Sequence, residues 1–203
     1  LFVFPKPLQK RSGGHTLCAL GYGHLRWGLT FGEGNDLGEI SLSSINNMKI
    51  TLLTIGKTLD LALKELENKY EKRLVHYAHW KRVDLSEIKN STLNEDQRKE
   101  KEGALFLSKI EPSDTVFLLD ERGTAYDSVS FANFIEKHHL ARSKHLVFCI
   151  GGAFGFSQAM YQRAHGMISL SKMTFTHEMI RLIFIEQLYR AHTILKKEKY
   201  HHS

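Results

Sequence analysis

The chain is poor in cysteine, in proline and in long apolar runs. Its 203 residues include two cysteines, Cys18 and Cys149, which lie far apart in the sequence. Two such residues cannot build a disulfide framework, so a reducing compartment is expected. No segment approaches the roughly 18 consecutive apolar residues of a membrane span, and the first residues lack the charged and apolar regions of a signal peptide. We therefore expect a soluble, cytoplasmic protein with no membrane partner.

Size and charge set further bounds. The formal net charge at pH 7 is +6, and 42% of the residues are hydrophobic. A chain of this length and content can bury one good core, so we expect a single main domain. A basic surface suits a polyanion such as a nucleic acid, but ordinary enzymes carry similar charges, and both interpretations stay open. No cysteine or carboxylate lies at ligand spacing from the terminal histidines, so we expect no metal site.

Residues 1–47 differ in composition from the rest of the chain. They hold eight of the fifteen glycines and two of the three prolines, and their apolar residues follow neither a two-residue nor a helical period. The first methionine is Met48, where the first regular strand is predicted to begin. We predict that 48–203 forms the main domain. Residues 1–47 are expected to be an extension outside it, disordered or produced by an over-long reading of the gene, with a small β appendage as the alternative.

From Met48 onward, strand-like and helix-like apolar periods alternate. Strands are predicted at 48–55, 77–85, 115–120, 145–150 and from 168, and helices at 61–76, 100–110, 129–139, from about 157, and 178–195. The polar stretch 86–98 is predicted to be a loop, 121–123 a turn, and Ser128 a helix N-cap. This alternation favours an α/β fold with a mostly parallel sheet and helices on its faces.

A glycine-rich corner, GGAFG at 151–155, follows the predicted strand at 145–150 directly. Glycines at such a place let the backbone approach a ligand and leave N–H groups available to it. The spacing is not that of a dinucleotide fingerprint, and no P-loop lysine follows. A ligand-binding loop and a plain tight turn therefore both remain open.

A second corner, ISLSKMTFTH at 168–177, carries four hydroxyl side chains. These hydroxyls suit a neutral heterocycle better than a phosphate, although Thr174 or Thr176 could equally cap the following helix. Ligands of open α/β sheets bind beyond the carboxyl ends of strands. Two such corners close together in the chain predict one ligand site.

The predicted closing helix is apolar around much of its circumference, which requires partners on two sides. One partner is the sheet, and the other could be a second copy of the chain. Arg181, Glu186, Tyr189 and Arg190 interrupt the apolar surface. They indicate a paired polar network or a site, with a simple Glu186–Arg190 helix pair as the alternative.

Together these segments resemble the SPOUT class of methyltransferases, and more closely the bacterial ribosomal large-subunit pseudouridine N3-methyltransferases. The resemblance covers 48–203. The matching residues are MKIT at 48–51, KEG at 101–103, Leu119-Asp120 with Gly123, IGG at 150–152 with Gly155, 170–175 with His177, Arg181, Glu186, Tyr189-Arg190 and Tyr200-His201. Thr176 departs from the pattern, because the family often has proline there.

The resemblance implies an α/β fold with a mostly parallel sheet and a deep carboxyl-terminal trefoil knot around S-adenosylmethionine. It assigns the methyl donor to eight residues: Leu119, Gly151, Leu170, Ser171, Lys172, Met173, Thr174 and Phe175. It also implies a homodimer that methylates N3 of a pseudouridine in 23S ribosomal RNA, on the assembled ribosome.

For catalysis, the resemblance and the chemistry both point to the end of the chain. The imide N–H of pseudouridine is only weakly acidic, so its proton must leave with or before methyl transfer, and a nearby base helps. We assign His201 as the catalytic residue, with Tyr200 positioning the acceptor base and His177 as the competing candidate. Arg181 and Arg190 are expected to hold RNA phosphate.

Two other functions stay open. A ribosome-associated binding module would keep the fold without binding the donor, and the intact glycines Gly151, Gly152 and Gly155 argue against it. Another knotted methyltransferase would act on tRNA with the same chemistry. The terminal Tyr200-His201 and the lack of an RNA-binding extension favour ribosomal RNA.

Overall fold

The computed structural model describes residues 48–89, 92–141, 143 and 145–200. The strands of this part are β1 (Lys49–Ile55), β2 (His79–Leu85), β3 (Thr115–Ala125), β4 (His145–Ile150) and β5 (Gly166–Ser169). Its helices are α1 (Leu61–Leu74), α2 (Glu95–Leu107), α3 (Ser128–Leu140), α4 (Gln158–Arg163) and α5 (His177–Leu195). The predictions made for residues 1–47 and for His201 lie outside the described residues.

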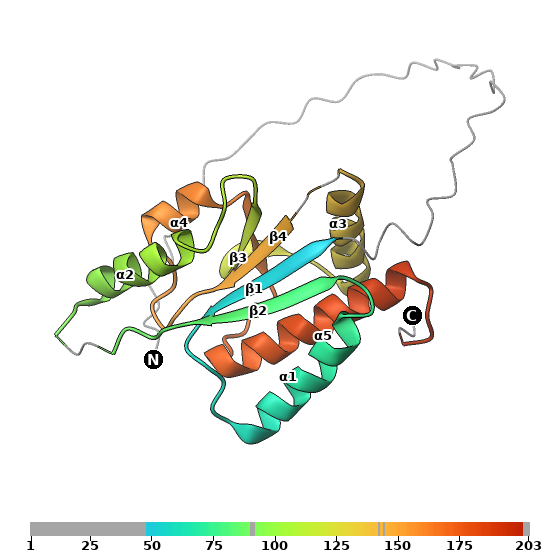
Figure 1. The fold of residues 1–203 in the computed structure, drawn as a ribbon, viewed down its shortest axis with the longest axis horizontal. Coiled ribbons are helices and arrows are strands. Elements are labelled where there is room, and N and C mark those ends of the chain that lie inside the picture. The colour runs from blue at the N-terminus through green and yellow to red at the C-terminus, as the bar shows by residue number, and fades with distance from the viewer. Residues whose placement is uncertain (1–47, 90–91, 142, 144, 201–203) are drawn as a thin grey trace, which may run out of the picture. The chain divides into compact units, whose positions relative to one another are not determined.

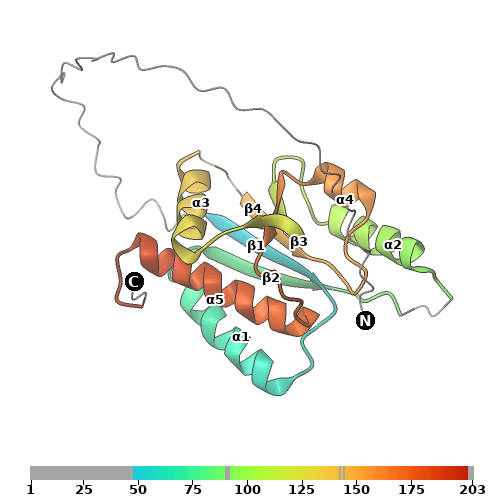
Figure 2. The ribbon, with the colours of Figure 1, turned by 180° about the vertical axis from the view of Figure 1, so that it is seen from behind.

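The five strands form one sheet in the order β2-β1-β4-β3-β5, and every neighbouring pair runs parallel. Helices α1, α3 and α5 cover one face of the sheet, and α2 and α4 cover the other (Figure 1; Figure 2 shows the same layers from behind). The predicted α/β architecture with a parallel sheet is therefore confirmed.

Both faces of the sheet are apolar, as expected for parallel strands covered on two sides. Ile50 and Leu52 of β1 belong to the core beneath α1, α3 and α5. Leu53 and Ile55 of the same strand belong to the second core, beneath α2 and α4. Six of the seven residues of β1 are therefore buried, including Thr51 and Thr54.

Two helix starts differ from the sequence prediction because of capping side chains. Asn94 Oδ1 accepts a hydrogen bond from the Gln97 amide (2.8 Å), and Gln97 Oε1 accepts one from the Asn94 amide (3.2 Å), which completes a capping box. Helix α2 therefore begins at Glu95, inside the stretch predicted to be a loop. Asp127, and not Ser128, caps α3 by accepting from the Ser130 amide at 2.6 Å.

Strand β3 is longer than predicted, and the stretch 121–123, expected to be a turn, lies within it as a bulge: Leu119 and Thr124 both pair with Ile168, and Asp120 Oδ1 accepts from the Arg122 amide (3.0 Å). The strand continues to Ala125, and its ladder with β5 shifts register between Leu119 and Thr124. A Cβ at Gly123 would lie 2.5 Å from the backbone nitrogen of Ile168, so glycine permits this close approach of two strands. The remaining elements begin and end close to the predicted positions.

Candidate active site at the carboxyl ends of the strands

The sheet register brings the predicted donor-binding segments to one edge. Leu119 of β3 pairs with Ile150 of β4 on one side and with Ile168 of β5 on the other. Gly151 follows Ile150 directly, and the loop 170–175 begins just after β5. Three segments that are far apart in the sequence therefore adjoin at the carboxyl ends of neighbouring strands, where ligands of open α/β sheets bind.

The loop at 151–155 has a conformation that depends on its glycines. Gly155 has a φ of +81°, and Gly152 forms an isolated antiparallel bridge with it. A Cβ at Gly151 would lie 3.1 Å from the carbonyl oxygen of Gly155, so the loop closes tightly on itself. Such a loop presents bare backbone to whatever lies beside it.

A buried carboxylate packs against this loop from α2. Glu102 is only 3% exposed, and a Cβ at Gly152 would lie 2.4 Å from its Oε2 atom. Within the described residues, Oε2 has no hydrogen-bond partner. Burial raises the pKa of Glu102, while Arg98 opposes the shift. The next residue, Gly103, packs equally closely, because a Cβ there would lie 2.2 Å from Ser157 Oγ.

Sequence reasoning did not assign Glu102 to the site. The residue lies in a charged stretch of α2 that has no distinctive spacing, and the resemblance at 101–103 was the one signal that marked it. Its importance follows from the contact with Gly152, which only the tertiary structure shows.

The second predicted donor segment, 170–175, is ordered by its own hydroxyls at the start and exposed beyond. Ser169 Oγ donates to the Ser171 carbonyl (3.1 Å), and Ser171 Oγ accepts from the Met173 amide (2.8 Å). Leu170 is half-buried against the core, whereas Lys172, Met173, Thr174 and Phe175 are exposed. The apolar Met173 side chain is 76% exposed, which leaves it available to a ligand.

Helix α5 begins directly after this segment. Thr176 Oγ1 accepts from the Met179 amide at 3.2 Å, so the predicted capping role of Thr176 is confirmed. His177, the competing catalytic candidate, is exposed at the first position of α5, next to the donor loop. Its exposed position leaves its role as a proton acceptor open.

Arg181 does not fit the prediction that it holds RNA phosphate. Its side chain is 1% exposed, its Nη1 donates to Thr58 Oγ1 (3.1 Å), and its Nη2 donates to the Ile55 carbonyl (2.7 Å). Thr58 in turn donates to Glu67 (2.8 Å), which pairs with Arg82 (2.6 Å). Because no surface of Arg181 faces solvent, its role here is to tie α5 to the end of β1 and to α1.

The polar residues farther along α5 form a paired network. Arg190 Nη2 lies 2.6 Å from Glu186 Oε1, which confirms the helix pair considered above. The Tyr200 hydroxyl donates to the same Glu186 oxygen (3.1 Å) and lies 3.3 Å from the Tyr70 hydroxyl. The Arg190 guanidinium lies 4.8 Å from the centre of the Tyr200 ring. Burial, together with the contacts to Tyr70 and Glu186, raises the pKa of Tyr200.

This network anchors Tyr200 to a part of α5 that lies well beyond the loop 170–175 along the chain. Glu186 follows His177, the first residue of α5, by nine positions, which corresponds to roughly 14 Å along a helix. Tyr200 and the loop 170–175 are therefore attached to different parts of α5.

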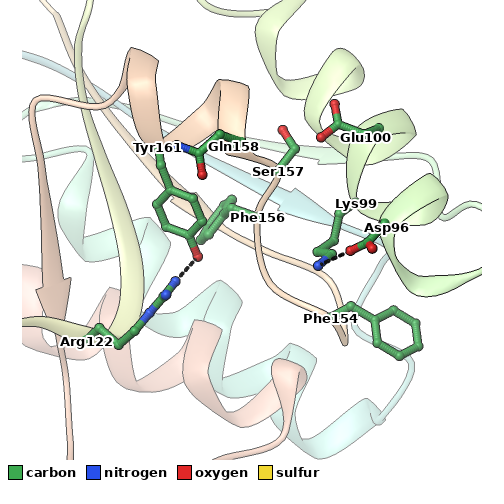
Figure 3. A pocket seen from close by; sticks show the side chains of 9 residues that line it. All are labelled: Asp96, Lys99, Glu100, Arg122, Phe154, Phe156, Ser157, Gln158 and Tyr161. Carbon is green, nitrogen blue, oxygen red and sulfur yellow. Dashed lines mark hydrogen bonds and ion pairs between the residues drawn. The ribbon is translucent and has the colours of Figure 1, made fainter.

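A pocket of about 400 Å³ lies beside the glycine loop (Figure 3). Its lining comes from α2, β3, the segment 154–157 and α4, and consists of Asp96, Lys99, Glu100, Arg122, Phe154, Phe156, Ser157, Gln158 and Tyr161. At its β3 side, the Tyr161 hydroxyl donates to Asp120 Oδ2 at 2.7 Å and accepts from Arg122. Burial alone raises the pKa of Asp120, but the hydrogen bonds from Arg122 and Tyr161 outweigh it and lower that pKa.

The described part of the chain holds no group of three or more histidine, cysteine, aspartate or glutamate side chains that could bind a metal ion. Among the helices of the same part, none combines the length and the apolar character needed to cross a membrane.

Comparison with known proteins gives a family match over the same residues. The family model described as "Predicted SPOUT methyltransferase" matches residues 48–201. The protein named ribosomal RNA large subunit methyltransferase H from Parabacteroides distasonis is 51% identical over 156 residues, covering 76% of this chain and 99% of the relative. The protein of the same name from Cytophaga hutchinsonii is 48% identical over 155 residues, covering 76% of this chain and 100% of the relative.

Among solved structures, a probable methyltransferase from Bordetella pertussis Tohama I is similar with a TM-score of 0.45 and 11% sequence identity. That similarity covers 74% of this chain and 97% of the other.

Proposed function

We propose that this chain, which belongs to the SPOUT methyltransferases and within them to the family of ribosomal RNA large subunit methyltransferase H, transfers a methyl group from S-adenosylmethionine to large-subunit ribosomal RNA. The finer assignment is N3 of a pseudouridine in 23S ribosomal RNA on the assembled ribosome. The observation that carries the proposal is the register of β3, which joins Leu119, Gly151 and the loop 170–175 at one edge of the sheet.

The residues at this edge fit the donor. We assign its binding to Leu119, Gly151 and the residues Leu170, Ser171, Lys172, Met173, Thr174 and Phe175. Gly151 lets the loop close on Gly155, and with Gly152 and Gly155 it leaves backbone without side chains, so a ligand can lie against the main chain. Exposed apolar side chains and hydroxyls follow in 170–175, which suits a neutral heterocycle and an apolar thioether chain. We further propose that the segments after β3, β4 and β5 form the trefoil knot of the family.

For this reaction the protein mainly has to align the methyl group of the donor with the acceptor nitrogen. S-adenosylmethionine supplies an electrophilic methyl group on a sulfonium, and direct displacement breaks the sulfur–carbon bond while a nitrogen–carbon bond forms. The chain must hold the acceptor nitrogen in line with the methyl group and exclude water from both. It must also accept the proton of the acceptor N–H, which is the role we assign to His201, with Tyr200 positioning the base. His177 is the alternative proton acceptor.

The position of Tyr200 supports a homodimeric site. Within one chain, Tyr200 is held by Glu186 and Tyr70, roughly 14 Å along α5 from the donor loop. We therefore propose that the end of one chain serves the donor site of its partner copy. Within one chain, α5 already packs on the sheet and against α1 and α3, so the argument for a second copy rests on the position of Tyr200.

We assign the contact with RNA phosphate to Arg190 and not to Arg181. The Arg190 side chain is 26% exposed, so it can approach a phosphate, whereas Arg181 is enclosed. Phosphate contacts position the RNA but carry no sequence choice, so specificity must come from the shape of the ribosomal site.

Mass mapping of 23S ribosomal RNA tests the proposal. A strain that lacks the gene should lose one methyl group at a pseudouridine, and expression of residues 48–203 should restore it. Titration calorimetry with S-adenosylmethionine should show saturable binding. A mutant strain with unchanged RNA masses, or a protein with no donor binding, would contradict the proposal; the latter result would favour the non-enzymatic binding module.

A further inference from the structure

The pocket beside the glycine loop is separate from the residues assigned to the donor. Neither Leu119, nor Gly151, nor any residue of 170–175 lines it. Yet one of its walls is Phe154, which lies between Gly152 and Gly155 in the loop that follows β4 (Figure 3). A molecule in this pocket would therefore contact the same loop as the donor from a different side.

The pocket offers aromatic surfaces. Phe154 is 36% exposed, a large exposure for a phenylalanine, and the guanidinium of Arg98 lies 5.6 Å from its ring centre. Deeper in the pocket, Phe156 is buried and its ring centre lies 6.0 Å from that of the half-buried Tyr161. Phe156 and Tyr161 meet nearly edge to face (78°), so the exposed ring of Phe154 is the face on which a flat molecule can stack.

The charges of the pocket are largely paired with one another. Lys99 lies 2.6 Å from Asp96, and Arg122 is held by Asp120 at 3.1 Å. Each of these cations faces a carboxylate, so the pocket carries little unpaired positive charge. Glu100 and Gln158 add hydrogen-bonding groups to the lining. Paired charges, amide and carboxylate acceptors and exposed aromatic rings suit a neutral, planar heterocycle with its own donors and acceptors.

We propose that this pocket binds an unpaired nucleobase of the RNA substrate, adjacent to the base that is methylated. The proposal rests on the function proposed above, because it takes RNA as the methyl acceptor. An enzyme that reaches one base of a folded RNA meets unstacked neighbours, and proteins hold such bases by stacking them on aromatic side chains. Phe154 supplies the exposed ring for this contact, and the flanking glycines set its place on the loop.

The test measures methyl transfer to ribosomes purified from a strain that lacks the gene. For Phe154→Ala, the KM for ribosomes should rise about tenfold, since loss of one stacked base weakens RNA binding by this order. The kcat should stay within about twofold of wild type, and the Kd for S-adenosylmethionine, measured by calorimetry, should not change. Phe154→Trp should restore the wild-type KM, because the indole ring also stacks.

Leu140→Ala is the matched control, because Leu140 is another exposed apolar residue (51% exposed), at the end of α3 on the opposite face of the sheet. Its KM should equal that of wild type. The pocket proposal is overturned if Phe154→Ala keeps the wild-type KM, if Phe154→Trp fails to restore it, or if donor binding weakens in parallel, which would show that Phe154 only supports the loop. Failure of the proposed function looks different: the wild-type protein itself would transfer no methyl group to these ribosomes, and both proposals would fall.

Discussion

The buried His192 makes the free energy of unfolding of this fold fall as the pH falls. The residue lies near the end of α5, its side chain is 0% exposed, and neither ring nitrogen has a hydrogen-bond partner among the described residues. Its ring stacks on Tyr77 with 5.8 Å between ring centres. Burial, reinforced by the facing Lys196 and His139, lowers the pKa of His192 to about 4. The fold therefore holds this imidazole in its neutral form.

The direction of the effect follows from linkage. In the unfolded chain, histidine has a pKa of about 6.5. Above that pH both states are neutral at this position, so His192 imposes no penalty. Between about pH 6.5 and 4, the imidazole binds a proton in the unfolded state but not in the folded state. Stability then falls by about 1.4 kcal/mol per pH unit, or about 3 kcal/mol in total.

The assay is urea unfolding followed by circular dichroism at pH 7.5 and pH 5.0, at one protein concentration. Wild type should lose about 2 kcal/mol through His192 between these two values, in addition to the contributions of other groups. His192→Phe should lack this loss, because it keeps an aromatic ring against Tyr77 and removes the titrating group. His76→Gln, a change at an exposed histidine, is the control and should follow wild type. An equal loss in wild type and His192→Phe would refute the reasoning.

Four further predictions concern the site and its supports. Gly152→Ala should weaken donor binding, measured by calorimetry, about 10-fold or more, because the added Cβ meets the Glu102 carboxylate. Adding Glu102→Ala to the same chain should recover part of the lost affinity. If no affinity is recovered, this contact is not the cause. Arg181→Met should lower the free energy of unfolding by about 3 kcal/mol, since it breaks a buried charge network, while the salt dependence of ribosome binding stays unchanged. In contrast, Arg190→Ala should reduce that salt slope by about one, and a reversed pattern would restore Arg181 as the phosphate ligand. At a donor concentration well below the Kd of the Gly152→Ala chain, co-expressed Gly152→Ala and His201→Ala chains should regain roughly a quarter of wild-type turnover, because half the dimers are mixed and each has one complete site. Turnover no higher than that of the two variants alone would place the end of the chain in its own donor site.

The sequence predicts the layers of this fold well, because its signals there are local. The run at 49–55 (KITLLTI) carries apolar residues or threonine at every position after Lys49, which is typical of a strand covered on both faces, and β1 is buried in that way. The start of α2 is also local, but it depends on the side chains of Asn94 and Gln97, whose polar character resembles that of a loop until the capping box is recognised.

Other features could not be predicted because their causes lie elsewhere in the chain. Strand β3 continues past Asp120 because Gly123 lets it approach Ile168 of β5, and a glycine after an apolar run otherwise indicates a turn. Arg181 looks like a surface cation by residue type. Its burial follows from partners at Thr58 and Ile55, more than 120 residues earlier in the chain.

The same separation of local and distant causes applies to the candidate site. The two glycine- and hydroxyl-rich corners were visible in the sequence, and the parallel register of β3 explains why they meet. Leu119 of β3 pairs with Ile150, the last residue of β4, and with Ile168 near the end of β5, so the residues that follow both neighbours lie beside it. The strand register does not position the end of the described chain, because no strand follows α5 there. Tyr200 is fixed by Glu186 and Tyr70 on the side of α5, so the helix that leads away from the donor loop also carries the tail away from it. Tyr200 is anchored at Glu186, roughly 14 Å along α5 from His177 and the loop 170–175, and its proposed role of positioning the acceptor base therefore leads to the proposal that the end of the chain serves a second copy.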